Sequence, residues 1–77
     1  MNKIIVYRKE SCSLCDEVES LIEILQEDYI IDVSKIDIEG NIELEHKFML
    51  EIPVLVINGE ELEYRHLDLS AVRERLH

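Results

Sequence analysis

The pair Cys12 and Cys15, separated by Ser13 and Leu14, constrains the fold of this chain more than any other feature of its sequence. It follows the apolar run 4–7 and precedes a long stretch with helical periodicity. A helix N-terminus lowers the free energy of an anion, so a cysteine placed there is shifted toward the thiolate, the form that attacks disulfides. The chain has only these two cysteines, and any sulfur chemistry is therefore expected at this junction of strand and helix.

The composition indicates one globular domain that spans residues 1–77. A chain of this length has room for one modest core, and 47% hydrophobic residues are enough to fill it. The N-terminal residues lack the pattern of a secretory leader, and no run approaches the roughly 18 apolar residues of a membrane span. A cytoplasmic protein is therefore expected, and in that compartment paired cysteines are more often catalytic or metal-binding than structural.

The charge balance argues against a nucleic-acid partner. Eighteen acidic and eight basic residues give a formal net charge of −10, and such a surface repels phosphate backbones. The acidity has two interpretations: it keeps the protein in solution, or it selects a basic partner protein.

Apolar periodicity predicts seven elements in the order βαβαββα. Strands are expected over residues 3–8, 29–37, 54–57 and 62–65, and helices over about 13–28, over 41–50 and after Asp68. The crossover through the first helix makes the first two strands parallel, and the Asn58-Gly59 turn makes the last two antiparallel. The predicted fold class is therefore α/β, with a mixed four-stranded sheet flanked by helices. The cysteine pair lies at the carboxyl end of the first strand, where open α/β sheets build their sites.

Several side chains have expected local roles. Ser11 precedes the cysteine pair and is expected to cap the first helix, and Asp68 to cap the last one. Leu67 lies at the position from which it would pack onto Val72 as a hydrophobic staple. The residues expected to face the core are Ile42, Phe48 and one of Leu44 or Met49 in the second helix, and Leu69, Val72 and Leu76 in the third.

Two segments carry a family resemblance. Residues 7–15, Tyr-Arg-Lys-Glu-Ser-Cys-Ser-Leu-Cys, look like the strand end, basic residue and active-site segment of glutaredoxins. Residues 52–55, Ile-Pro-Val-Leu, look like the Ile/Val-Pro segment of the same family. Over nearly its whole length the chain resembles the glutaredoxin branch of the thioredoxin superfamily, most closely the short bacterial glutaredoxin-like proteins. The resemblance implies a thioredoxin-like fold and an enzyme, a thiol–disulfide oxidoreductase.

The resemblance also implies roles for the two cysteines and for the basic residue before them. Cys12, nearest the helix N-terminus, would be the nucleophile, and Cys15 the resolving thiol that attacks the mixed disulfide from within. Lys9 matches the family's basic residue, which stabilises the thiolate and meets a glutathione carboxylate, although a solvated lysine at a strand end is the alternative. Ser13 and Leu14 lie between the cysteines and would contact the substrate.

Further substrate contacts are implied at Ile52, Pro53 and Asp68. In the family the proline is cis and lies against the cysteine pair, so that the backbone of Ile52 would face the sulfurs and pair with an extended substrate. The alternative is that Pro53 simply begins an edge strand. Glutathione is a possible reductant, but residues 65–68, Arg-His-Leu-Asp, keep only the acidic cap of the Gly-Gly-x-Asp turn found in glutathione-binding members.

The expected partners are protein or small-molecule disulfides, with glutathione or a thioredoxin-reductase-type enzyme as the source of electrons, and the protein is expected to be a monomer. No tightly bound cofactor or metal is expected. A zinc site would need two ligands from His46, His66 and His77, which have no metal-binding spacing. An iron–sulfur cluster that bridges a dimer and a non-catalytic adaptor with a thioredoxin-like groove stay open as alternatives.

Overall fold

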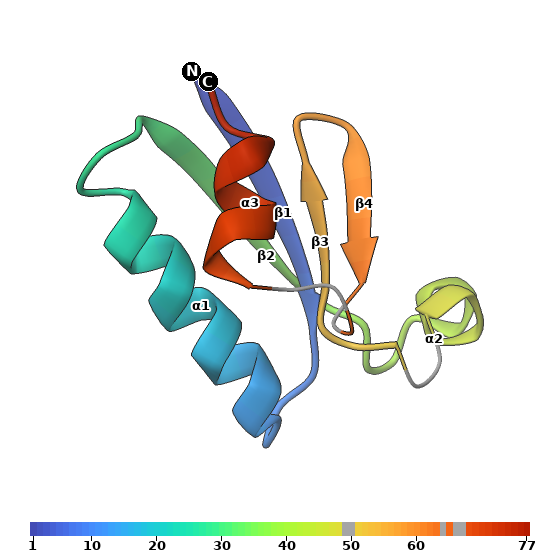
Figure 1. The fold of residues 1–77 in the computed structure, drawn as a ribbon. Helices are drawn as coiled ribbons and strands as arrows, with labels where there is room; N and C mark the ends of the chain where they lie inside the picture. The colour runs from blue at the N-terminus through green and yellow to red at the C-terminus, as the bar shows by residue number, and fades with distance from the viewer. Residues whose placement is uncertain (49–50, 64, 66–67) are drawn as a thin grey trace.

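The structure is a computed structural model that describes residues 1–48, 51–63, 65 and 68–77. Its strands and helices follow the predicted order βαβαββα (Figure 1). They are β1 (Asn2–Arg8), α1 (Ser13–Leu25), β2 (Ile31–Asp37), α2 (Ile42–Phe48), β3 (Val54–Ile57), β4 (Glu60–Glu63) and α3 (Leu69–Glu74). The predicted α/β class with a mixed four-stranded sheet flanked by helices is thus confirmed.

The strand order β2-β1-β3-β4 brings two distant segments to one end of the sheet. β1 runs parallel to β2 and antiparallel to β3, with Tyr7 opposite Val54. The carboxyl end of β1 therefore lies beside the amino end of β3 (Figure 1). Because the cysteine pair follows β1 and Pro53 precedes β3, both lie at this end of the sheet. We call this end, made of residues 12–15 and 52–53, the redox edge, after the chemistry expected of the cysteines.

Each face of the sheet carries its own apolar cluster. Strand residues alternate between faces, and the face of Ile4 and Val6 packs against α1 and α3. The opposite face packs Val54 against Ile38 and Phe48, the last of these from α2. A sheet covered on both sides needs apolar residues at nearly every position, which explains the continuous apolar runs of β1 and β3.

Helix α1 ends at Leu25, three residues before the predicted end at residue 28. The amides of Glu27 and Asp28 bond the carbonyls three residues before them, and the amide of Tyr29 bonds the carbonyl of Leu25. The last turn is therefore tightened and closed by backbone bonds, a common end for a helix. The following strand accordingly begins at Ile31, two residues later than predicted.

Two side chains expected in the core are exposed. Ile42 is 72% exposed, because it lies two residues, or about 200°, from Leu44 on the helix that turns Leu44 and Phe48 inward. Leu69 is 37% exposed, whereas Val72 and Leu76 are buried as predicted. The predictions for Met49 and Leu67 fall outside the described residues.

The hairpin turn at Asn58-Gly59 is confirmed, but β4 begins earlier than predicted. Ile57 pairs directly with Glu60, so the turn has two residues and the strand covers Glu60–Glu63. Both turn residues have positive φ, 49° and 89°, as the tightest hairpin turn requires. The strand predicted to begin at residue 62 therefore begins two residues earlier.

The side chain of Asn2 joins both ends of the chain to the hairpin. Asn2 is 1% exposed. Its Nδ2 donates to the carbonyls of Ile30 and His77, at 3.2 and 3.0 Å. Its Oδ1 accepts from the amide of His77 at 2.8 Å and from Nδ2 of Asn58 at 3.0 Å. The buried amide group is thus fully satisfied, and the two termini lie side by side (Figure 1).

Candidate active site

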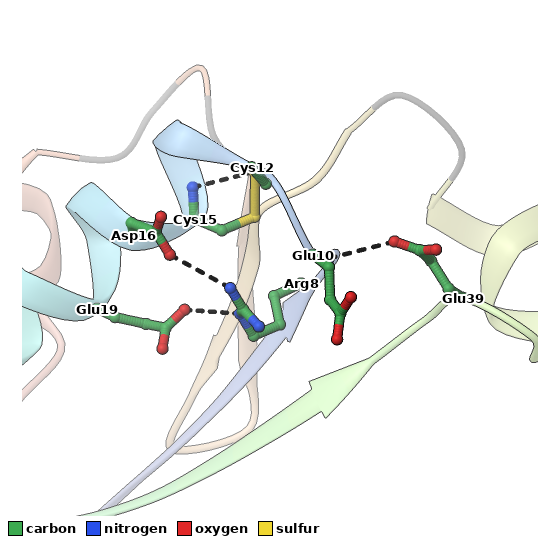
Figure 2. Close-up of a disulfide and its surroundings, with 7 residues drawn as sticks. All are labelled: Arg8, Glu10, Cys12, Cys15, Asp16, Glu19 and Glu39. Atoms are coloured by element: carbon green, nitrogen blue, oxygen red, sulfur yellow. Dashed lines mark hydrogen bonds and ion pairs between the residues drawn. A yellow bond between two sulfur atoms is a disulfide. The ribbon is translucent and has the colours of Figure 1, made fainter.

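Cys12 and Cys15 form a disulfide at the start of α1 (Figure 2). Their Cα atoms are 5.2 Å apart, because one helical turn brings residues three apart onto the same side. Cys12 is half-buried, whereas Cys15 is 0% exposed and belongs to the inward face of α1. An incoming sulfur can therefore reach Cys12 but not Cys15.

Cys12 itself caps α1, in place of the predicted Ser11. The Sγ atom of Cys12 accepts a hydrogen bond from the amide of Cys15 at 3.1 Å. Ser11 is exposed and adopts a left-handed backbone with φ of 54°, so its side chain is not at the capping position. The sequence prediction failed here because cysteine is seldom counted among capping residues.

We expect Ser11→Gly to stabilise the protein. A non-glycine residue in the left-handed region costs about 1 kcal/mol or more, and glycine adopts this backbone without that penalty. Glycine also gives the unfolded chain more conformational entropy, which offsets part of this gain. The free energy of unfolding should therefore rise by about 0.5 kcal/mol in urea titrations. The matched control is Ser13→Gly, within the helix, which should lower it by a similar amount. A loss of stability in both variants would contradict a left-handed Ser11.

The loop before the disulfide is held by the connection between β2 and α2. The amide of Glu10 donates to Oε1 of Glu39 at 3.2 Å (Figure 2). Glu39 is placed in turn by its own amide, which bonds Oδ1 of Asp37 at 2.8 Å. The amide of Ile38 also donates to the carbonyl of Arg8 at 2.9 Å. The segment that presents Cys12 is therefore anchored on both sides, by α1 and by residues 37–39.

A charged cluster missed at the sequence level lies beside the disulfide. Nε of Arg8 donates to Oε2 of Glu19 at 2.7 Å, and Nη2 contacts Oδ1 of Asp16 at 3.3 Å (Figure 2). Nζ of Lys35 bonds the other oxygen of Glu19 at 2.9 Å. Burial alone would raise the pKa of Glu19, but the Lys35 hydrogen bond and the charges of Arg8 and Lys35 hold this pKa below its ordinary value. Glu19 is thus a fixed anion between two cations.

The sequence does hold a signal for this cluster. Arg8 continues the alternation Asn2, Ile4, Val6, whose side chains are buried on one face of the sheet. A charged residue at the next inward position predicts a buried partner on the helix above. Glu19 lies four residues after Cys15 and supplies it.

The segment before β3 completes the redox edge. The Ile52-Pro53 peptide bond is cis, as the family resemblance implied. Pro53 is buried and Ile52 is half-buried. The register places them next to the end of β1, from which the disulfide loop departs.

The other predicted contact residues occupy separate positions. Lys9 is half-buried in the loop after β1, and Ser13 and Leu14 are exposed on the first turn of α1. Asp68 caps α3, as predicted, by accepting from the amide of Ala71 at 2.7 Å. The substrate contacts expected of these residues stay predictions.

An open cavity of about 730 Å³ extends from the segment around Pro53 along β4 to α3. Its described lining holds five carboxylates and two guanidinium groups. These charged residues are Glu51, Glu61, Glu63, Asp68, Glu74, Arg65 and Arg75. The cavity therefore offers a predominantly negative surface beside the redox edge.

Among the described residues, no group of three or more His, Cys, Asp or Glu side chains could hold a metal ion. His46 and His77 are exposed, and His66 lies outside the described part of the chain. Within the same residues, no helix is both long and apolar enough to cross a membrane.

Comparisons with known proteins agree with this architecture. Protein Ne2328 from Nitrosomonas europaea, solved by solution NMR, is 30% identical and superposes with a TM-score of 0.83 over 99% of this chain and 92% of its own. A single-residue mutant of thioredoxin from Halobacterium salinarum NRC-1 is 25% identical, with a TM-score of 0.68 over 97% of this chain and 71% of its own. A malarial protein, 17% identical with a TM-score of 0.62 over 100% of this chain and 99% of its own, shares the fold.

No curated protein sequence matches the chain. The model of one family, described as Glutaredoxin-like domain (DUF836), matches residues 3–77. Its match takes in the cysteine pair, the Ile52-Pro53 segment and, apart from the first residue of β1, every helix and strand from β1 to α3. With its thioredoxin-like fold and its pair of cysteines at disulfide distance, this chain belongs to the glutaredoxin-like domain family.

Proposed function

We propose that this protein is a thiol–disulfide oxidoreductase in which Cys12 is the nucleophile and Cys15 the resolving thiol. The observation that carries the proposal is the asymmetry of the pair: Cys12 is half-buried and Cys15 is 0% exposed. The Cys12 thiolate attacks a substrate disulfide and releases one substrate thiol, which leaves a mixed disulfide. The Cys15 thiolate then attacks Sγ of Cys12, the mixed disulfide breaks, and the second substrate thiolate takes a proton from water.

The start of α1 supports the role of Cys12. The amide of Cys15 already donates to Sγ of Cys12 at 3.1 Å. In the reduced protein the same amide would bond the thiolate, and a hydrogen bond to the charged form favours that form. The positive end of the helix acts in the same direction. The dithiol itself carries the two electrons, so the reaction needs no resident cofactor.

Disulfides in proteins are the substrates that the redox edge favours. The exposed Leu14 and the half-buried Ile52 would contact an extended polypeptide, whose backbone could pair beside Pro53. The acidic lining of the neighbouring cavity disfavours the carboxylates of glutathione, although Lys9 could offset part of this repulsion. We therefore propose that a thioredoxin-reductase-type enzyme reduces the cysteine pair again after each turnover, with glutathione as the second choice. We also propose that the protein acts in the cytoplasm as a monomer.

The proposal is tested by titrating the protein against glutathione redox buffers and counting its states by intact mass. We expect a reversible intramolecular disulfide with a midpoint between roughly −180 and −280 mV, the range of related dithiols. Glutathione adducts should stay minor species if repulsion at the cavity operates. A pair that stays reduced throughout the titration would sink the oxidoreductase proposal, and abundant adducts would overturn the preference for protein disulfides.

A further inference from the structure

The side chain of Arg8 occupies a place where the sheet would otherwise present an apolar residue. Asn2, Ile4 and Val6 are 0–1% exposed and point to the α1 face of the sheet, and Arg8 is the next residue in this row. Its side chain is only 22% exposed. Figure 2 shows the guanidinium below the turn that carries Cys15, directed toward Asp16 and Glu19. A cation therefore lies under the first turns of α1, on the buried side.

The helix geometry brings this cation close to Cys15. Residues four apart on a helix have Cβ atoms about 5–6 Å from each other, so Glu19 lies one turn from Cys15 on the same side of α1. Arg8 spans this turn, because it contacts two residues of α1. One is Asp16, which follows Cys15 in the sequence, and the other is Glu19, which lies one turn further along the helix. A charge at this position is poorly screened, since both Arg8 and Glu19 are mostly buried.

The four side chains of the cluster differ in how far solvent screens them. Formally, the cations of Arg8 and Lys35 balance the carboxylates of Asp16 and Glu19, and both cations contact Glu19, at 2.7 and 2.9 Å. Lys35 and Asp16 have side chains 52% and 72% exposed, so solvent screens much of their charge. Arg8, at 22% exposed, is the less screened of the two cations.

We propose that Arg8 is a positioning residue for the resolving step, whose cation holds the buried sulfur of Cys15 as a thiolate once the disulfide is open. This inference rests on the proposed function. A fully buried thiol resists ionisation, because burial disfavours the charged form. A nearby cation offsets that cost, so the Cys15 proton can leave to water and the thiolate can attack Sγ of Cys12 in the mixed disulfide.

Among the described residues near this turn, two other cations come from neighbouring segments. Lys35 of β2 contacts Glu19, and Lys9 is half-buried in the loop after β1, whereas Arg8 contacts both carboxylates of this part of α1, Asp16 and Glu19. The segment before β3 brings Ile52 and Pro53, which carry no charge, and the exposed carboxylate of Glu51. The start of α3 brings the carboxylate of Asp68, which is exposed and bonded to its own helix.

The test measures the ionisation of Cys15 alone, in a Cys12→Ser background, by thiolate absorbance against pH. Arg8→Met should raise the midpoint by about one pH unit, and Arg8→Lys should restore most of it. Glu19→Gln should lower the midpoint, because it removes an anion and leaves an oxygen that still accepts from Arg8. Thermal unfolding of each variant checks that the fold is kept.

The two midpoints are expected to shift in opposite directions, which distinguishes an electrostatic role of Arg8 from a purely structural one. Arg8→Met and Glu19→Gln weaken the same contact, so a structural role would move both midpoints in one direction, which would overturn the inference. Unchanged midpoints in both variants would overturn it as well. With both cysteines present, an aromatic disulfide such as dithiobis(nitrobenzoate) releases one chromophore per attack. Arg8→Met should slow the second release about tenfold at neutral pH and leave the first nearly unchanged. Loss of the first release would instead count against Cys12 as the nucleophile, and so against the proposed function.

Discussion

Replacing Cys12 by serine should lower the rate of disulfide exchange by at least about a thousandfold, because the reaction loses its nucleophile. Cys15→Ser should behave differently. Its Cys12 still attacks, but the mixed disulfide has no internal thiol to break it and should accumulate as a covalent complex with the substrate. The measurement is a reaction with a disulfide-bonded substrate protein, quenched with acid and followed by intact mass and non-reducing electrophoresis.

A matched pair of controls guards against indirect effects. Ser20→Ala changes an exposed hydroxyl further along α1 and should leave the yield of both species close to that of the parent protein. The double variant Cys12→Ser, Cys15→Ser should form no complex. Equal loss of exchange from either single change, without a trapped complex, would contradict the division of roles between an accessible and a buried sulfur.

Asn2→Ala should lower the free energy of unfolding by about 3 kcal/mol, the largest effect expected from a residue remote from the redox edge. The change removes four hydrogen bonds, and buried partners left unsatisfied cost about 1–3 kcal/mol each, reduced where water can enter. Urea titration gives the value directly. The exchange rate should stay within about twofold, because Asn2 lies at the opposite end of β1 from the cysteines.

Asn41→Ala is the matched control for this effect. Asn41 is an exposed asparagine whose Oδ1 accepts from the amide of Leu44 at 3.1 Å, so its removal should cost about 1 kcal/mol. A loss in Asn2→Ala no greater than in Asn41→Ala would mean that the Asn2 contacts contribute little. The contrast thus separates a buried junction from an ordinary helix cap.

Local signals in the sequence were enough to predict most of the fold. The cysteine pair at a strand–helix junction, the Asn58-Gly59 turn and the cap at Asp68 depend on neighbouring residues, and all three are present in the structure. The cis bond at Pro53 was predicted from the family resemblance. Such features are predictable because their energetics are decided within a few residues of the chain.

The wrong predictions concern contacts between distant parts of the chain or competition at element ends. Whether Ile42 or Leu44 faces inward depends on how a short helix meets the sheet, and both have the required apolar character. The exchange of capping roles between Ser11 and Cys12 depends on the backbone turn that follows β1. The bonds between Arg8 and Glu19 join two elements whose packing the sequence pattern does not state.

The position of the redox edge within the sheet affects how well this site keeps its structure when other parts of the protein open locally. Its two segments extend from β1 and β3, the inner strands, each of which is bonded on both sides. An outer strand such as β2 or β4 can detach by losing one ladder, whereas an inner strand is released only when two ladders break. Partial openings at the margins of the molecule therefore leave the two segments joined through the β1–β3 ladder, and the arrangement of sulfur and proline should outlast the fluctuations of the strands around it.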